Sequence, residues 1–174
     1  LKGTLDDNGT CHAEHSGALS RDNQTLLKDA NFVVHHSGNI PEVQGNGMIG
    51  ENHLNFRFAS DTNGNGELDL EAENAGGVFR FLDLTEAVSG GRLKLISNFQ
   101  GDNLSIHDSE IRLSNFTLKE APLLVDVFSL ISPTGLLEQL LGDEVFYDEG
   151  YGKVSVSGNR YTIHEASAVG FSSG

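Results

Sequence analysis

The sequence predicts a mainly β protein whose strands pair antiparallel, and three observations carry that prediction. Several short runs alternate apolar and polar residues, which is the pattern of strands with one face in water. The 174 residues include 21 glycines and only 3 prolines, a composition that suits many turns between short strands. One long apolar stretch, 121–142, departs from this alternation and has helical spacing instead.

Composition limits the classes of function that the chain can serve. The 11 Lys and Arg against 25 Asp and Glu give a formal net charge of −14, which disfavours binding to nucleic acid and to anionic lipid headgroups. Cys11 is the only cysteine, so neither an internal disulfide nor a thiolate metal cluster can form. The chain starts in what reads as a strand, with no signal peptide, and we expect residues 1–174 to be one fragment of a longer protein.

Residues 53–60 form the clearest predicted strand, because apolar side chains alternate with polar or small ones at every step. The run 67–72 repeats this alternation after a turn at 61–66 that is rich in Asn and Gly. The two runs are therefore predicted to form a hairpin with one apolar face. The strands expected before the first helix are 1–5, 11–19, 30–36, 45–50 (a short strand or a bend), 53–60 and 67–72.

The spacing of apolar residues changes after residue 74. Val78, Phe81 and Leu82 share one helical face, which predicts a short helix over about 75–88. The glycines at 90–91 are expected to end this unit, after which the alternation typical of strands resumes.

The strands that follow contain one break in phase. Ile111 and Leu113 lie on one face of a strand, whereas Phe116 and Leu118 fall on the other. A β-bulge near 114–115 would return all four side chains to one apolar face. The strands expected in this half are 93–99, 104–106, 111–118, 152–156 and 161–168, which brings the total to roughly eleven.

The apolar stretch is divided by Ser132 and Pro133, and it predicts two further short helices, 122–131 and 133–141. Ser132 is expected to cap the second helix, with Pro133 in its first turn. The stretch is too short and too interrupted to span a bilayer, which needs about 20 unbroken apolar residues. It must be covered by a sheet, a lipid or a partner, and the side chains expected to form this helical cap are Leu124, Phe128, Leu137 and Leu141.

Residues 61–69 have the spacing of a calcium loop. Oxygen-bearing side chains stand at loop positions one, three, five and nine, and a glycine stands at position six. Ala72 replaces the bidentate glutamate of position twelve, and both flanks read as strands. A hairpin turn without an ion is therefore the prediction, with weak calcium binding as the alternative.

Histidines and acidic residues are numerous but form no motif that carries chemistry. His12 and His15 are three apart, and His35 and His36 are adjacent, so on strands neither pair points to one side. No Gly-x-Ser-x-Gly motif and no phosphate-binding lysine loop is present. We therefore expect no metal site, no cofactor and no enzymatic activity. A triad assembled from distant positions is left open.

The alternating strands predict one continuous apolar sheet face. A core closed by helices is the ordinary explanation of such a face, but the expected helices are few and short. Part of the face is therefore predicted to stay open as a groove. The residues expected to line it are Leu54, Phe56, Phe58, Leu68, Leu70, Leu93 and Leu95.

Just over half of the chain, 72–170, resembles the C-terminal region of the AsmA-like envelope proteins, and of their YhdP-like branch in particular. The run AENAGGVFRFLDLTEAVSGGRLKL at 72–95 is similar to one unit of that family. The run 109–170 is similar to its closing pattern, although 142–145 and 157–159 depart from it. The matching positions are Asn115, Phe116, Ala121, Pro122, Leu130, Ser132, Gly135, Leu136, Gly142, Phe146 and Gly170.

The resemblance implies a repeating β-groove, which is a long, twisted antiparallel sheet curved into an open channel with an apolar inner face. Proteins of this family carry phospholipid between the inner and outer membranes of Gram-negative bacteria. These proteins are anchored in the inner membrane by an N-terminal helix, so the resemblance implies such an anchor, which we expect outside residues 1–174. The implied partners are phospholipid, the membrane at one end of the protein and other envelope proteins, and the implied location is the periplasm.

Two other readings compete with lipid transfer. The first is a structural or adhesive β-domain of a surface protein with a closed core. The second is a module stabilised by calcium at residues 61–69.

Overall fold

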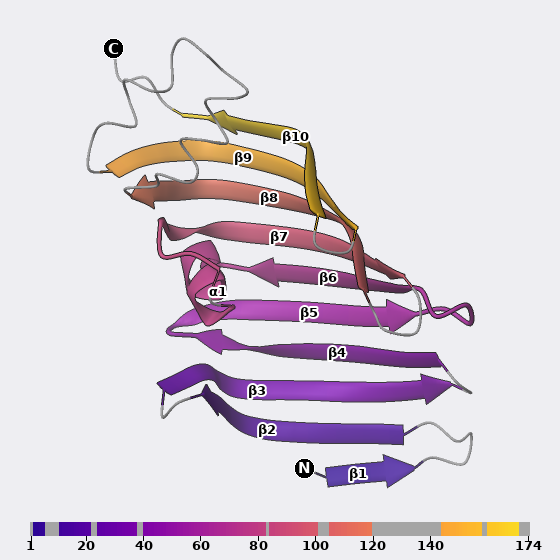
Figure 1. The fold of residues 1–174 in the computed structure, drawn as a ribbon. Coiled ribbons are helices and arrows are strands. Elements are labelled where there is room, and N and C mark those ends of the chain that lie inside the picture. Colours follow the sequence, from indigo (N-terminus) through magenta and orange to yellow (C-terminus); the bar gives the residue numbers. More distant parts are fainter. Residues whose placement is uncertain are drawn as a thin grey trace.

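In the computed structural model the described residues form one open antiparallel sheet of ten strands, arranged in the order of the sequence from β1 to β10 (Figure 1). Each strand pairs with the one before it, so every connection is a hairpin or a longer link between neighbours. The predicted fold class, mainly β with an open sheet, is confirmed. The structure describes residues 2–5, 11–21, 24–37, 40–82, 84–100, 105–119, 144–157 and 160–170.

The described part of the chain contains one helix, α1, between β6 and β7. The longest strands are β3, β7, β8 and β9, with 13 to 15 residues each. The elements are β1 Lys2–Leu5, β2 Cys11–Arg21, β3 Gln24–Ser37, β4 Ile40–Ile49, β5 Asn52–Ser60, β6 Gly66–Ala72, α1 Ala75–Phe81, β7 Val88–Gln100, β8 Ser105–Lys119, β9 Glu144–Ser157 and β10 Arg160–Val169.

Ten strands replace the roughly eleven that were predicted, because the runs 104–106 and 111–118 belong to one strand, β8. The glycine-rich run 45–50, expected as a short strand or a bend, is part of the ten-residue β4. A Cβ built on Gly45 would lie 2.4 Å from the Phe56 ring, and one on Gly47 would lie 2.7 Å from Leu27. Large side chains of the neighbouring strands therefore cover these glycines and supply the packing that glycine lacks.

Helix α1 is shorter than the predicted 75–88. Asn74 caps it, because its Oδ1 accepts a hydrogen bond from the Gly77 N–H at 2.9 Å. The helix ends at Phe81, and further on the Thr85 hydroxyl accepts a hydrogen bond from the Ala87 N–H. That local bond competes with helical pairing and leads the chain into β7.

The predicted β-bulge near 114–115 is wrong, although the backbone does change direction at this point. Asn115 has φ +53, and in the facing strand Gly90 and Gly91 have φ +63 and +75. The pairing of β8 with β7 and β9 keeps its register across this point, so no extra residue is inserted. The left-handed backbone turns Phe116 and Leu118 back to the apolar side, where both are buried. We call this line across the sheet the crease.

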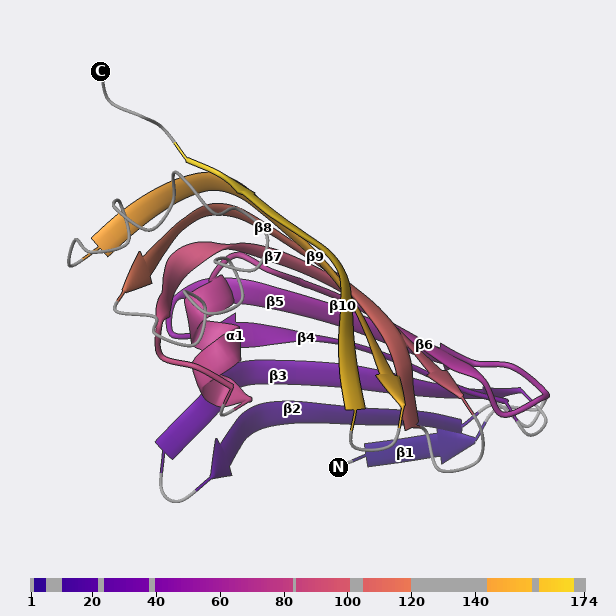
Figure 2. The same cartoon turned by 45° about the horizontal axis from the view of Figure 1, so that its top comes forward.

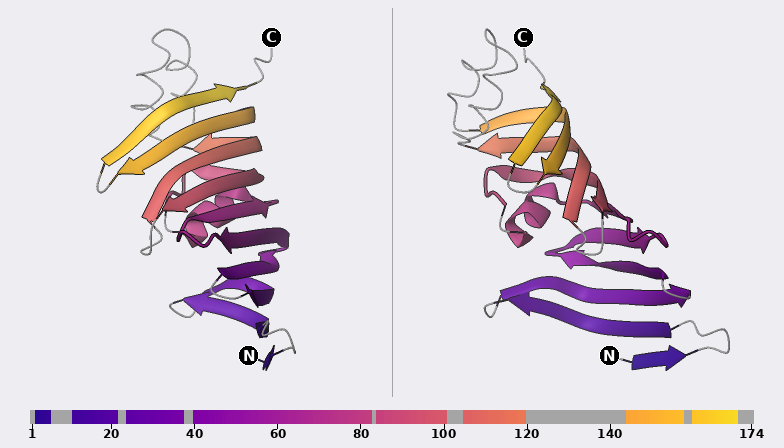
Figure 3. Two further views of the ribbon diagram at one scale, coloured as in Figure 1. Left: turned by 90° about the vertical axis from the view of Figure 1, so that its right-hand side faces the viewer. Right: turned by 45° about the vertical axis from the view of Figure 1, so that its right-hand side comes forward.

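The sheet is twisted and strongly curved, and β8, β9 and β10 bend over at the end opposite to α1 (Figures 2 and 3). Helix α1 lies inside the curve, against the concave face (Figure 2). The buried core gathers between this helix and the sheet, and Val78 of α1 is its most deeply buried large side chain. The concave face is therefore the apolar one, and among the described residues a helix lies over one of its ends.

Candidate functional site

The seven predicted lining residues lie on one face, because they occupy paired positions on three neighbouring strands. Phe56 of β5 pairs with Leu70 of β6, which pairs in turn with Leu95 of β7. Directly opposite residues in an antiparallel sheet share a face. The other four residues occupy the rows on either side, with Leu54 and Leu93 in one row and Phe58 and Leu68 in the other.

The apolar rows continue beyond these three strands into β8, β9 and β10. Leu95 pairs with Ile111, and in the neighbouring row Val154 pairs with Ile163. Alternation within one strand shows which of its residues share a side. Only the register between strands shows that these sides join into the same face. The residues of this face that were not among the seven predicted lining residues are Phe99, Ile106, Ile111, Val154, Tyr161 and Ile163.

The end of the apolar face nearest α1 is closed. Leu54 is 6% exposed and Leu93 is 3% exposed, because α1 and the residues beyond the crease cover them. Phe116 and Tyr147 stack there with their ring centroids 5.4 Å apart, and burial raises the pKa of the Tyr147 hydroxyl. We call this region the covered end, and it is an ordinary packed core.

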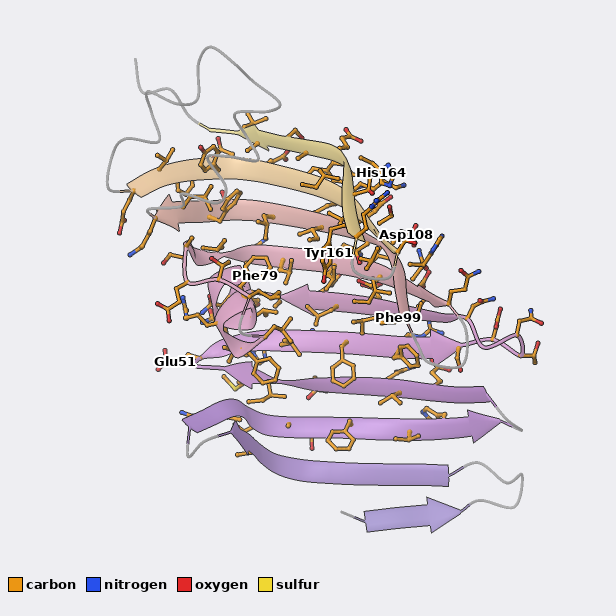
Figure 4. All side chains as sticks on the ribbon, viewed as in Figure 1. Glu51, Phe79, Phe99, Asp108, Tyr161 and His164 are labelled. Carbon is orange, nitrogen blue, oxygen red and sulfur yellow. The ribbon has the colours of Figure 1, made fainter. Side chains whose placement is uncertain are left out.

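The rest of the face, which we call the open end, has no helix over it among the described residues. Phe56, Phe58, Leu68, Leu70 and Leu95 are only partly buried. Ile163 and Tyr161 on the outermost strand are 46% and 73% exposed. Figure 4 shows Phe79 on α1 and Phe99 toward the opposite end of the strands, which marks the two ends of the face.

The open end presents mostly apolar side chains. Phe58 meets Phe99 edge to face at 5.8 Å, and a Cβ on Gly66 would lie 2.8 Å from the Phe58 ring, so that ring lies close over the glycine of the next strand. Ser97 and Ser109 are the polar residues of the row, and their hydroxyl oxygens lie 2.8 Å apart in a hydrogen bond. The two hydroxyls satisfy each other, so the row presents no unpaired hydroxyl to an apolar ligand.

The opposite face of the sheet is polar and carries cross-strand ion pairs. Arg57 Nε lies 2.7 Å from Glu42 Oε1, and Lys153 Nζ lies 3.2 Å from Glu110 Oε1. Hydrogen bonds from Gln44 and then Arg57 lower the pKa of the Glu42 carboxyl. These pairs are exposed and add little stability.

The predicted calcium-like loop is a hairpin turn between β5 and β6. Asp61 Oδ1 accepts hydrogen bonds from the Asn63 and Asn65 N–H groups at 2.8 and 2.9 Å, and Oδ2 accepts one from Asn65 Nδ2 at 3.0 Å. These bonds lower the pKa of the Asp61 carboxyl, the side-chain bond from Asn65 most of all. The carboxylate therefore serves the turn itself, as an Asx-type cap.

The structure brings together one pair of residues that the sequence did not suggest. Ser155 Oγ lies 2.7 Å from His164 Nε2, and the register shift between Ile163 and Glu165 places His164 there. Asp108 of β8 occupies the position opposite Ser155 of β9, and Figure 4 labels both Asp108 and His164 toward the bent ends of these strands. The imidazole is exposed on the outermost strand, and a nucleophile–base pair also needs an enclosed site with oxyanion donors.

The remaining expectations fall on strands or outside the described residues. His12 and His15 lie on β2, and His35 and His36 on β3. Within the described ranges, no three His, Cys, Asp or Glu residues gather as a metal site would require. The predicted helices 122–131 and 133–141, with Leu124, Phe128, Leu137 and Leu141, lie outside the described residues.

The described part of the chain contains no helix with the length and apolar character needed to cross a membrane. Comparison with known proteins found no matching family model, no matching curated protein and no matching solved structure.

Proposed function

We propose that this chain is a non-enzymatic segment of a bacterial envelope lipid-transfer protein of the AsmA-like kind. In this proposal, the open end of the apolar face holds the acyl chains of phospholipid. The observation that carries it is the contrast within one face. Mostly apolar rows run from β5 toward β10, with the hydrogen-bonded Ser97 and Ser109 inside one of them, but α1 covers only one end of these rows.

The chemistry of the open end suits an acyl chain. Moving an acyl chain from water onto an apolar surface is worth about 0.8 kcal/mol for each buried CH₂ group. Phe56, Phe58 and Leu70 offer such a surface, and the paired hydroxyls of Ser97 and Ser109 remove the polar obstacle in it. Similar apolar contacts on successive strands favour weak and similar binding along the sheet, which transfer requires.

The proposed mechanism needs no covalent step and no cofactor. Acyl chains lie against the concave face, and the headgroup projects toward the open side of the curve. The resemblance of residues 72–170 to AsmA-like proteins supports a periplasmic location and an inner-membrane anchor supplied by the rest of the protein. Phospholipid is then the ligand, with a membrane and other envelope proteins as partners. The net charge of −14 disfavours nucleic acid in this role.

A charge placed in the open end tests the proposal. The protein is purified from an envelope fraction, and bound lipid is extracted and quantified by mass spectrometry. Phe56→Asp places a carboxylate where the acyl chain must lie, so we expect a folded protein with at least about tenfold less lipid, since a lone charge against hydrocarbon is strongly disfavoured. Asn55→Asp is the matched control, because it adds the same charge one residue away on the polar face. A parent protein without lipid, or equal lipid in both variants, would contradict the proposal.

A closed structural or adhesive β-domain is the second candidate, and the covered end favours it. Leu54, Val78 and Leu93 are packed as in any folded domain. If the open end is also closed in the full-length protein, Phe56→Asp should unfold the domain rather than release a ligand. Thermal melting of the same variant separates the two functions.

A further inference from the structure

The polar face carries a trough that the lipid proposal does not use. It has a volume of about 630 Å³, within the range of small-molecule sites. Its lining comes from six consecutive strands, β5 to β10, so it crosses the sheet over roughly 24 Å at about 4.8 Å for each strand spacing. Charged and polar side chains line it, among them Asn55, Arg92, Lys94, Arg112 and Tyr151.

Three of the chain's 11 Lys and Arg residues meet in this trough, although the protein as a whole is strongly acidic. Lys94 of β7 and Arg112 of β8 occupy directly opposite positions. Arg92 lies two residues before Lys94 on the same strand, and it pairs with Ser114 of β8. Like charges directly opposite each other destabilise a sheet unless other groups compensate them.

The protein neutralises only part of the positive charge of these three side chains. Lys94 Nζ lies 2.8 Å from Glu71 Oε1, which neutralises that cation. The Arg112 guanidinium lies 5.3 Å from the centroid of the Tyr151 ring, a contact that orients the group without cancelling its charge. No ion pair of Arg92 is found among the described residues. Two guanidinium groups therefore remain available to an oxyanion, which they can bind in bidentate fashion.

The other groups of the trough define the rest of the ligand. Glu73 and Glu149 also line it, and they would repel a phosphate dianion more strongly than a single carboxylate. Neutral hydrogen-bonding groups, among them Asn55 and the hydroxyls of Ser114 and Ser167, suit hydroxyl groups on the ligand. The elongated shape across the strands suits an extended chain rather than a compact molecule.

We propose that this trough binds an acidic saccharide, with a sugar carboxylate between Arg92 and Arg112 and its hydroxyl groups along the neutral side chains. The site lies on the face opposite to the acyl-binding face, so it does not depend on the proposed lipid function. It would give the protein a polar ligand in addition to an apolar one.

The test is isothermal titration calorimetry of the whole chain at low ionic strength. The probe is a trimer of galacturonate, and the matched ligand is the neutral galactose trimer, in which each carboxylate is a hydroxymethyl group. We expect binding of the acidic trimer that weakens with added salt, and at least about tenfold weaker binding of the neutral one. Arg92→Met and Arg112→Met should each weaken binding of the acidic trimer by about tenfold or more.

Lys153→Met is the matched control, because Lys153 is also a cation of the polar face but does not line the trough. It should change the affinity less than about twofold, and the melting temperature of each variant checks that the fold is retained. Failure of the parent to bind the acidic trimer, equal binding of the neutral trimer, or unchanged affinity in both Arg variants would overturn the proposal. Binding of inorganic phosphate that depends on Arg92 and Arg112, without binding of the trimer, would overturn it in favour of a phosphate site.

Discussion

The two ends of the apolar face are built from the same strands and the same alternation of residues, but the described residues form a closed core at only one of them. At the covered end Leu93 of β7 is 3% exposed, whereas two residues further along the strand Leu95 is only partly buried. Leu93 belongs to the buried core together with Val78 of α1, whereas Leu95 packs against the edge of that core. Alternation in the sequence therefore predicts which side chains share a face, but not whether that face is closed.

The crease explains why the closure is local. Gly90, Gly91 and Asn115 turn the backbone into the left-handed region at one level of the sheet. Beyond that level Phe116 and Tyr147 point toward α1 and complete the core. At the open end the pairing of β7 with β8 shifts its register between Asn98 and Phe99, and this shift places Ile106 opposite Phe99 on the apolar face.

The largest expected effect contrasts two leucines of β7. Leu93→Asp places a carboxylate in the covered end, where it is cut off from water, and we expect a loss of about 4 kcal/mol or more in the free energy of unfolding. Leu95→Asp makes the same change in the open end, where the carboxylate can reach water, and we expect a loss of about 1–2 kcal/mol. Urea denaturation followed by circular dichroism measures both. Equal losses would mean that the open end is closed as well.

A pair of glycine substitutions tests how closely α1 lies on the sheet. A Cβ at Gly76 would lie 2.5 Å from the Val88 carbonyl oxygen, so Gly76→Ala must displace backbone and should destabilise by about 1–3 kcal/mol. A Cβ at Gly152 in β9 would meet nothing within 4 Å, so Gly152→Ala should be neutral or slightly stabilising. Both changes are read from the denaturant midpoint. If Gly76→Ala also proves neutral, the close approach of the helix to β7 is wrong.

The cap of α1 gives a smaller effect at the covered end. Asn74→Ala removes the acceptor of the Gly77 N–H and should lower the free energy of unfolding by about 1 kcal/mol. Asn74→Asp keeps an acceptor oxygen at the same place, so its stability should stay within a few tenths of a kcal/mol of the parent. A loss of similar size in both variants would show that the side chain acts through packing instead of capping.

The face and the order of the strands follow from the sequence because both depend on local signals. The alternation in β5 and β6 and the Asn- and Gly-rich turn at 61–66 predict their hairpin, and the register then places Phe56 beside Leu70. The extent of β4 does not follow in this way. Gly45 and Gly47 read as a bend, and only the side chains of Phe56 and Leu27 lying over them explain a continuous strand there.

Features made by several strands at once could not be predicted from single runs. The crease appears in the sequence of β8 as a break in phase, which a bulge explains equally well. Only the matching left-handed glycines of β7, at the same level of the sheet, distinguish the two. The polar trough is a further example, because Lys94 and Arg112 are 18 positions apart and only the register makes them neighbours.

The smallest expected effect on stability concerns Asp61, in the turn that joins β5 to β6 at the open end. Asp61 accepts three hydrogen bonds within its loop, and these hold its pKa below the ordinary value of about 3.9. A carboxyl whose pKa is lowered on folding stabilises the protein above its unfolded pKa, and this contribution is lost as the pH falls toward the folded pKa. The difference in melting temperature between the parent and Asp61→Ala should therefore be constant above about pH 5, shrink below about pH 4 and be the same in calcium and in chelator. A difference that grows with calcium would show that the loop binds the ion. One that persists unchanged in acid would show that the carboxylate does not support the turn.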